Sequence, residues 1–333
     1  MKQLTKVLGV ILSGIVTIFP VTAGAQDYPS KPIHLLIPFT PGGGTDLISR
    51  VVSSKLAEAL KWQVIPENRP GAAGNLAIEM AGKSPADGYT IVVGQPDNMM
   101  VGPYLYANVG YDTLKSFVPI VQLSETSNVL VTNAPNNAAP AGAKLHLATM
   151  ADLIAKGKSS TGLIWATAGN GSTGHLYGEL FKSVAAIKLL QVPYKGAAPA
   201  LADVMGGHVD VAIMSVPSVL GLVRGGKLTP VAVTAGKRSA MLPNTPTLNE
   251  AGVKVVDTVN WLGLFAPAGT PPAIIARLNA GVNRVLQMPE VREKIAEGGA
   301  VAVGGSPEEF ASFVRSEYAK WGKIVKDSGV KLD

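Results

Sequence analysis

Short apolar runs alternate with amphipathic stretches along most of the chain. Residues 33–39 form an apolar run that predicts a buried strand, and the apolar residues of 45–60 recur at helical spacing. The same reasoning predicts further strands at 63–66, 90–94, 129–132, 163–167, 189–194, 209–214, 228–234 and 261–266, and helices at 272–287, 289–297 and 307–326. This alternation is typical of an α/β protein with parallel strands.

Two of the predicted strand-to-helix connections are rich in glycine. The first strand leads into Thr40-Pro-Gly-Gly-Gly-Thr-Asp46, and the strand at 163–167 leads into Ala168-Gly-Asn-Gly-Ser-Thr-Gly174. Glycine lets the backbone approach a ligand closely, and the start of a helix presents unpaired N–H groups at the positive end of its dipole. Each connection is therefore a candidate anion site. If the two belong to different lobes and face each other, they would grip one anionic group.

The residues around these glycines do not have the spacing that nucleotide-binding motifs require. Residues 169–174 match G-x-G-x-x-G, but the next strand ends in Tyr194-Lys-Gly196 and lacks the acidic residue that a dinucleotide fold requires there. Two Gly-Lys-Ser triplets, 82–84 and 157–159, lack the glycine that a phosphate-binding loop needs five positions earlier. We therefore expect no nucleotide cofactor.

Catalytic and metal-binding patterns are also missing from the sequence. The four histidines, at positions 34, 146, 175 and 208, are too dispersed for a metal motif, and no G-x-S-x-G nucleophile turn occurs. The chain has no cysteine, which excludes disulfides and thiolate metal sites. His175 opens the helix after the second glycine turn, where we expect a polar residue of the cleft wall. We predict no catalytic residue, no metal and no cofactor.

Composition and the N-terminus indicate an exported protein. Residues 1–25 carry two lysines, an apolar stretch of about 15 residues and a small-residue site, which predicts a signal peptide cleaved after Ala25; a membrane span needs about 20. Cleavage removes Lys2 and Lys6 and lowers the net charge from +6 to +4. The basic residues form no run, so no nucleic-acid partner is expected. We predict a periplasmic monomer that is not embedded in the membrane.

Ten segments, in order along the mature chain, resemble the Bug family, the extracytoplasmic solute receptors of tripartite tricarboxylate transporters (UPF0065-like proteins). They are Tyr28-Pro-Ser-Lys-Pro-Ile33, Pro38 to Asp46, Glu67-Asn-Arg-Pro-Gly71, Asp87-Gly-Tyr89, Ala168 to Ser172, His175-Leu176, Val192 to Ala197, Gly206 to Asp210, Leu264 to Pro271 and Gly304 to Glu308. The resemblance implies a two-lobed type II periplasmic-binding-protein-like α/β fold. Each lobe would be a mixed sheet flanked by helices, with a cleft between the lobes.

The resemblance also implies a division of the chain and a set of ligand-binding residues. We expect a first lobe from 27–122 and 229–258, a second lobe from 123–228, and a hinge return strand with C-terminal helices in 259–333. Asp46 is expected to cap the first helix and hold its turn in shape. The expected ligand-binding residues are Phe39, Thr40, Gly42, Gly43, Gly44, Asn98, Ala168, Gly169, Asn170, Gly171, Ser172, Thr173, His175, Tyr194, Met214 and Ser215.

The implied function is capture of a small carboxylate by lobe closure and its delivery to inner-membrane transporter subunits. The sequence leaves open whether the ligand is an aliphatic or aromatic mono-, di- or tricarboxylate. Relatives often carry an acid where this chain has Met214-Ser-Val216, so an amine-bearing ligand is disfavoured, and Met99, Met214 and Tyr194 suggest an apolar far end. Two alternatives remain: a ligand sensor that signals to a kinase, and an exported hydrolase, for which no nucleophile–base pair is evident.

Overall fold

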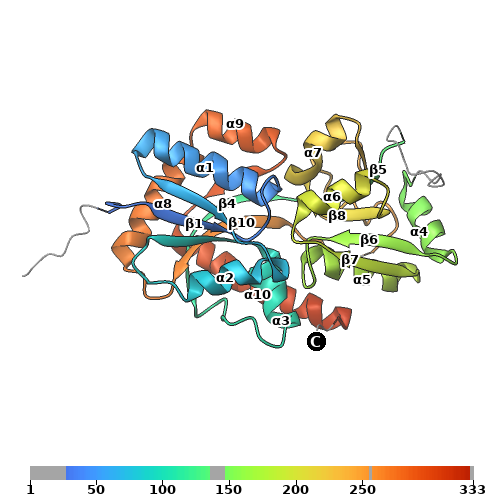
Figure 1. Ribbon diagram of the computed structural model, residues 1–333, viewed down its shortest axis with the longest axis horizontal. Helices are drawn as coiled ribbons and strands as arrows, with labels where there is room; N and C mark the ends of the chain where they lie inside the picture. Colours follow the sequence, from blue (N-terminus) through green and yellow to red (C-terminus); the bar gives the residue numbers. More distant parts are fainter. Residues whose placement is uncertain (1–27, 136–146, 255–256, 331–333) are drawn as a thin grey trace, which may run out of the picture.

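The protein folds into two lobes that lie side by side and are joined by crossing strands (Figure 1). The computed structural model describes residues 28–135, 147–254 and 257–330. The predicted signal peptide, and most of a loop that the sequence suggests at 133–143, lie outside these residues. Each lobe is built on one mixed sheet, with the order β11-β4-β10-β3-β1-β2 in the first lobe and β7-β6-β8-β5-β9 in the second. The predicted two-lobed α/β fold is confirmed.

The first lobe contains the N-terminal and C-terminal parts of the chain. Its strands are β1 (Ile33–Ile37), β2 (Val64–Asn68), β3 (Thr90–Gly94), β4 (Phe117–Thr126), β10 (Asn260–Pro267) and β11 (Val301–Gly304). Its helices are α1 (Gly44–Leu60), α2 (Asn75–Gly82), α3 (Gly102–Leu105), α8 (Pro272–Leu286), α9 (Pro289–Glu297) and α10 (Pro307–Ser328), with short helical turns η1 (Ala72–Gly74) and η2 (Pro96–Val101).

The second lobe is formed by the middle of the chain. Its strands are β5 (Asn128–Asn133), β6 (Leu163–Thr167), β7 (Leu189–Pro193), β8 (Val211–Ser215) and β9 (Leu228–Val233). Its helices are α4 (Met150–Lys158), α5 (Thr173–Ala185), α6 (Ala197–Met205) and α7 (Val216–Arg224).

Helices cover both faces of each sheet because the buried strands carry apolar side chains on both faces. In β1, Ile33, Leu35 and Ile37 pack with α1, α8 and α9, whereas Leu36 points to the other face and packs with α2 and α10. Successive side chains of a strand point to opposite faces, so a strand covered on both sides is apolar throughout. The parallel pairing of β1 with β2 and β3 places the loops after β1 and β3 at the same edge of the sheet.

The lobe boundaries differ from the expected ones. β4 remains in the first sheet up to Thr126, so the chain crosses at Ser127 and not at 122–123. β9 pairs with β5 in the second sheet, and Leu248 and Val253 pack there against Trp165, so the assignment of 229–258 to the first lobe is wrong. The chain returns to the first lobe only with β10, and α8 to α10 then complete that lobe.

The longest strand, β4, was missed by the hydrophobic pattern. Its sequence contains Pro119, which normally marks an edge strand because proline cannot donate to a neighbour. β4 nevertheless lies between β10 and β11, and its pairing with β10 shifts register between Leu264 and Phe265, opposite Pro119. β11 pairs with β4 only from Gln122 to Glu125, so Pro119 has a paired strand on the β10 side alone, and the register shift there further accommodates the proline.

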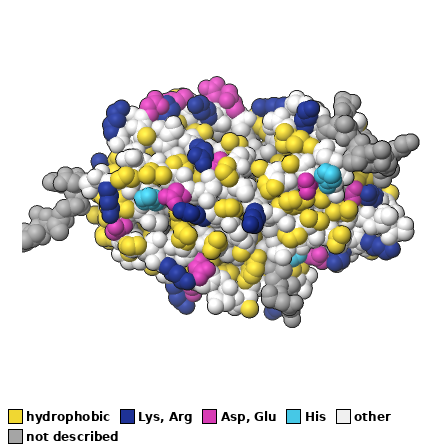
Figure 2. Space-filling model, in the orientation of Figure 1, with side chains coloured by type: hydrophobic (Ala, Val, Ile, Leu, Met, Phe, Trp, Pro, Cys, Tyr) yellow, Lys and Arg dark blue, Asp and Glu magenta, His cyan; other side chains and the backbone are white. Residues whose placement is uncertain are grey.

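The surface gives no sign of a polyanion-binding face on the side shown in Figure 2, where basic side chains are spread among acidic ones. Within the described residues, no helix is both long and apolar enough to cross a membrane.

Candidate functional site

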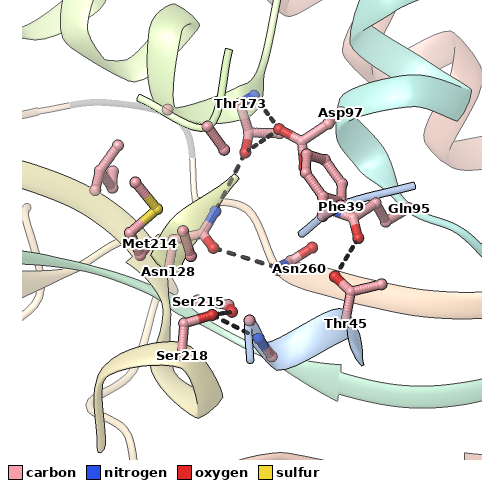
Figure 3. A pocket seen from close by; sticks show the side chains of 16 residues that line it. Phe39, Thr45, Gln95, Asp97, Asn128, Thr173, Met214, Ser215, Ser218 and Asn260 are labelled. Carbon is pink, nitrogen blue, oxygen red and sulfur yellow. Dashed lines mark hydrogen bonds between the residues drawn. The ribbon is translucent and has the colours of Figure 1, made fainter. Parts of the chain in front are cut away.

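A small cleft lies between the lobes, where α1 of the first lobe and α5 of the second both begin (Figure 3). Its cavity is about 40 Å³. The first lobe contributes Phe39, Gly43, Gly44, Thr45, Gln95, Asp97 and Asn260 to its lining, and the second contributes Asn128, Ala168, Thr173, Gly174, Ala197, Ile213, Met214, Ser215 and Ser218. Segments of both lobes touch directly around this cavity, so the structure shows the closed arrangement.

The start of α1 is capped by the opposite lobe. Gly43 is the N-cap residue, and the backbone N–H of Gly44 donates to Ser218 Oγ over 2.8 Å. A Cβ on Gly44 would lie 2.7 Å from Ser215 Oγ, so only glycine permits this approach. Asp46 holds the turn before the helix as expected, because its carboxylate accepts from the N–H of Gly42 (3.0 Å), but it is not the helix cap, which is Gly43. Asp46 is buried but does not line the cleft.

The start of α5 is shaped by its own side chains. Ser172 Oγ accepts from the backbone N–H of His175 (3.2 Å), and His175 Nδ1 accepts from the backbone N–H of Gly171 (3.2 Å). Burial lowers the pKa of His175, which keeps the imidazole neutral and leaves Nδ1 able to accept. Ser172 and His175 therefore stabilise the second glycine turn through these hydrogen bonds and do not line the cleft.

A carboxylate of the first lobe lies on the first N–H group of α5. Asp97 Oδ1 accepts from the backbone N (2.5 Å) and from Oγ1 (3.0 Å) of Thr173. Gln95 Nε2 donates to Asp97 Oδ2 (2.6 Å), and Gln95 Oε1 accepts from Thr45 Oγ1 (2.7 Å). Burial raises the pKa of Asp97, against the opposing effect of the hydrogen bonds from Gln95 and Thr173. A continuous polar chain thus connects the first turns of α1 and α5 across the lobes.

Two asparagines extend this chain to the strands that connect the lobes. Asn128 Nδ2, at the start of β5, donates to Thr173 Oγ1 (3.4 Å), and Asn260 Nδ2, at the start of β10, donates to Asn128 Oδ1 (3.3 Å). Asn260 Oδ1 is buried, and no described residue provides it with a donor.

The structure brings together only part of the predicted ligand set. Phe39, Gly43, Gly44, Ala168, Thr173, Met214 and Ser215 line the cleft, whereas Thr40, Gly42, Asn98, Gly169, Asn170, Gly171, Ser172, His175 and Tyr194 do not. Some of the latter contribute at its rim, since Asn170 O accepts from Tyr106 OH of the first lobe.

Three residues were expected at an apolar far end of the cleft, and for two of them the expectation is wrong. Tyr194 OH donates to the Asp203 carboxylate on α6, and Met99 is fully buried in the core below η2. Asn98 Oδ1 accepts from the backbone N–H of Gln95 (3.1 Å) and so shapes η2. The cleft does contain an acid, Asp97, which was not considered from sequence because only the segment after β8 was compared with relatives.

Sequence reasoning missed nine lining residues: Thr45, Gln95, Asp97, Asn128, Gly174, Ala197, Ile213, Ser218 and Asn260. A signal existed for Gln95 and Asp97, because they directly follow β3. Parallel strands place their following loops at one edge of a sheet, where ligands bind in α/β folds. Asn128 and Asn260 had no such signal, because they become neighbours only through the crossing of the lobes.

The chain matches the model of the tripartite tricarboxylate transporter family receptor (TctC) over residues 48–330. It belongs to this receptor family. The TctC-type receptor described here is 34% identical to protein BugT of Bordetella pertussis over 334 residues, a match that covers all of this chain and 99% of BugT. TctC-type receptors are solute-binding proteins and not enzymes, which removes the hydrolase alternative.

Solved structures agree with this assignment. Rpa4515 of R. palustris with adipate is 35% identical and superimposes with a TM-score of 0.84, covering 92% of this chain and 99% of that protein. MatC (Rpa3494) of Rhodopseudomonas palustris with bound malate is 28% identical with a TM-score of 0.82, covering 90% of this chain and all of that protein.

Proposed function

We propose that this TctC-type receptor captures a small carboxylate between its lobes in the periplasm and delivers it to inner-membrane transporter subunits. One observation carries the proposal: the first turns of α1 and α5 belong to different lobes and open onto the same cleft. A helix start offers unpaired N–H groups and a favourable dipole, which is worth about 0.3–1 kcal/mol for each anion. The cleft can therefore bind an anion without a basic side chain.

The relatives support a carboxylate as ligand. Rpa4515 and MatC hold adipate and malate, respectively, which are both small carboxylates. The α1 side of the cleft is lined by Gly43, Gly44, Ser215 and Ser218. Here the Gly44 N–H donates to Ser218 Oγ and the two serine hydroxyls share a hydrogen bond, so a carboxylate oxygen would accept from these donors in place of the present partners. Such charge-assisted hydrogen bonds contribute about 1.5–3 kcal/mol each.

Capture requires the lobes to separate and close again. The cavity is lined by segments of both lobes, so a ligand enters an open form and the lobes then close around it. Closure would bury the ligand and form the surface that the transporter subunits recognise, as a shift of population between two states.

A melting screen tests the carboxylate class. The protein is heated with mono-, di- and tricarboxylates, aliphatic and aromatic, and with the corresponding uncharged amides. A ligand at a hundredfold excess over its Kd stabilises the folded state by about 2.7 kcal/mol, so binding is readily detected. We expect at least one carboxylate to raise the Tm while its amide does not. The proposal fails if no carboxylate raises the Tm, or if amides act equally well.

Delivery is tested separately in cells. Uptake of the radiolabelled ligand should be lost when either the receptor or the membrane subunits are deleted. Uptake that is unchanged without the receptor would contradict delivery and leave capture intact.

A further inference from the structure

Asp97 is the acidic side chain of the cleft, and both of its carboxylate oxygens accept hydrogen bonds, from Gln95 and Thr173, which favours the ionised form against the effect of burial. Among the described residues that line the cavity, it is the one with a charged side chain, and no lysine, arginine or histidine accompanies it there. Its side chain is well buried, with the residue only 5% exposed. A carboxylate in such a place repels a second carboxylate more strongly than it would in water, because the surroundings screen the charges less.

Asp97 also occupies part of the donor set that an incoming anion would need. The first N–H group of α5 and the hydroxyl of Thr173 both donate to its Oδ1. The α5 side of the cleft thus already holds one carboxylate, supplied by the protein. Among the described lining residues, the α1 side holds no carboxylate. There the N–H of Gly44 donates to Ser218 Oγ and the hydroxyls of Ser215 and Ser218 share a hydrogen bond, so an incoming carboxylate would replace neutral acceptors only.

A second observation points in the same direction. Asn260 lines the cleft, is 7% exposed, and carries a buried Oδ1 that receives no hydrogen bond from any described residue. An unsatisfied buried acceptor is costly, so a hydrogen-bond donor on the ligand would remove that cost. Figure 3 shows Asn260, Asn128, Thr173 and Asp97 following one another along one wall of the cleft. This wall offers acceptors at both of its ends.

We propose that the receptor selects a monocarboxylate whose other end is a hydrogen-bond donor, in the first place an ammonium group, and discriminates against dicarboxylates. The carboxylate lies at the start of α1, and the donor end lies along the wall from Asp97 to Asn260. This inference rests on the proposed function and narrows its ligand class. It also reverses the sequence-based expectation that an amine-bearing ligand is disfavoured, because that expectation considered only the segment after β8.

Matched pairs of ligands test the proposal by calorimetry. The pairs are 4-aminobutanoate with succinate and 6-aminohexanoate with adipate. Both members of a pair carry a carboxylate at one end, and the other end is an ammonium group in the first and a second carboxylate in the second. The proteins are the wild type, Asp97→Asn and Glu58→Gln. Asp97→Asn keeps the shape of the side chain, and its Oδ1 can still accept from Thr173. Glu58→Gln removes an equal charge from the exposed surface of α1 and serves as the control.

In the wild type, we expect the amino acid of at least one pair to bind about tenfold or more tightly than the dicarboxylate, a difference of about 1.4 kcal/mol. Asp97→Asn should reduce this ratio about tenfold or more, and Glu58→Gln should leave it unchanged. The proposal is overturned if the dicarboxylates bind as tightly in the wild type, or if Asp97→Asn preserves the ratio. The wild-type comparison decides alone if Asp97→Asn does not fold. Binding of none of the four probes also overturns it, while a response to another carboxylate in the melting screen would leave the proposed function standing.

Discussion

The backbone N–H of Gly44 and the hydroxyl of Ser218 form a hydrogen bond of 2.8 Å between the two lobes. Gly44 is the first residue of α1, whose leading N–H groups have no partner within the helix. Ser218 lies on α7, on the far side of the cleft. One donor of α1 is therefore satisfied by protein only when the lobes are closed, which links the anion site directly to closure.

Ser218→Ala should weaken ligand binding because it removes this acceptor from the closed form. The loss of one hydrogen bond of this kind costs about 0.5–1.5 kcal/mol, so we expect the Kd of the carboxylate found in the melting screen to rise about twofold to tenfold. Calorimetry measures the change. Ser84→Ala is the matched control, because its hydroxyl donates to Met80 O on α2, away from the cleft. Equal Kd values for the two variants would show that the bond does not contribute to capture.

Gly44→Ala should prevent closure without harming either lobe. The new Cβ would meet Ser215 Oγ at 2.7 Å and Pro217 Cβ at 3.0 Å, both on the opposite lobe, while alanine is favourable within the helix itself. We expect the Tm to change by only a few degrees and the affinity for the carboxylate to fall more than about tenfold. The Tm and the affinity for the carboxylate are measured on the same preparation of the variant.

Gly43→Ala is the control for this prediction. A Cβ at Gly43 would have its nearest neighbours at 3.7 and 3.8 Å, which is ordinary contact, so this variant should retain most of its affinity. Equal loss of binding in both variants would mean that any side chain in the turn is harmful, and would contradict the role assigned to closure.

The features predicted from sequence are those determined by neighbours along the chain. The two glycine turns lie where they were expected because each strand, turn and helix is contiguous, and a glycine with positive φ, such as Gly171 at 74°, reflects a purely local need. The apolar run at 33–39 likewise identified β1, a strand that is covered on both faces.

The features that were missed depend on residues far apart in the sequence. β9 joins β5 across about a hundred residues, so nothing local showed that 229–258 stays in the second lobe. Pro119 concealed β4, because a proline is acceptable there only where β11 has ended and the pairing with β10 is irregular. Asn128 and Asn260 were overlooked because they become neighbours only where the chain crosses between the lobes. This part of the cleft is made by tertiary structure alone.

Gly263→Ala should destabilise the first lobe through the contact of β10 with α10. A Cβ at this position would lie 2.0 Å from Cζ of Phe310, which is buried between the strand and the helix. Overpacking of this kind costs about 1–3 kcal/mol, and urea unfolding should show a loss of that size.

Gly221→Ala provides the contrast, since a Cβ on this residue of α7 meets nothing within 4 Å. Replacing glycine by alanine in a helix gains up to about 1 kcal/mol, so this variant should be unchanged or more stable. A Gly263→Ala protein as stable as Gly221→Ala would show that α10 does not pack as tightly on β10 as the structure indicates.

His175 should make the second glycine turn sensitive to acid. Burial lowers the pKa of His175 below its usual 6.5, so in acid the unfolded chain takes up this proton before the folded protein does. Stability contributed by the neutral imidazole is therefore fully present above about pH 6.5 and is lost as the pH falls from there towards the folded pKa. The main physical cause of the loss is that burial disfavours the charged imidazolium, and a protonated Nδ1 can in addition no longer accept from the N–H of Gly171.

His175→Asn separates this titration from all others in the protein. The Asn side chain places an acceptor near the position of Nδ1 and does not titrate, so it can replace the hydrogen bond to Gly171 at every pH. We expect the free energy of unfolding, measured with urea, to fall more steeply in the wild type than in His175→Asn below about pH 6.5, by up to about 1.4 kcal/mol per pH unit for one proton. Parallel pH profiles would mean that the imidazole of His175 is not held neutral, and that the turn at the start of α5 keeps its shape by other contacts.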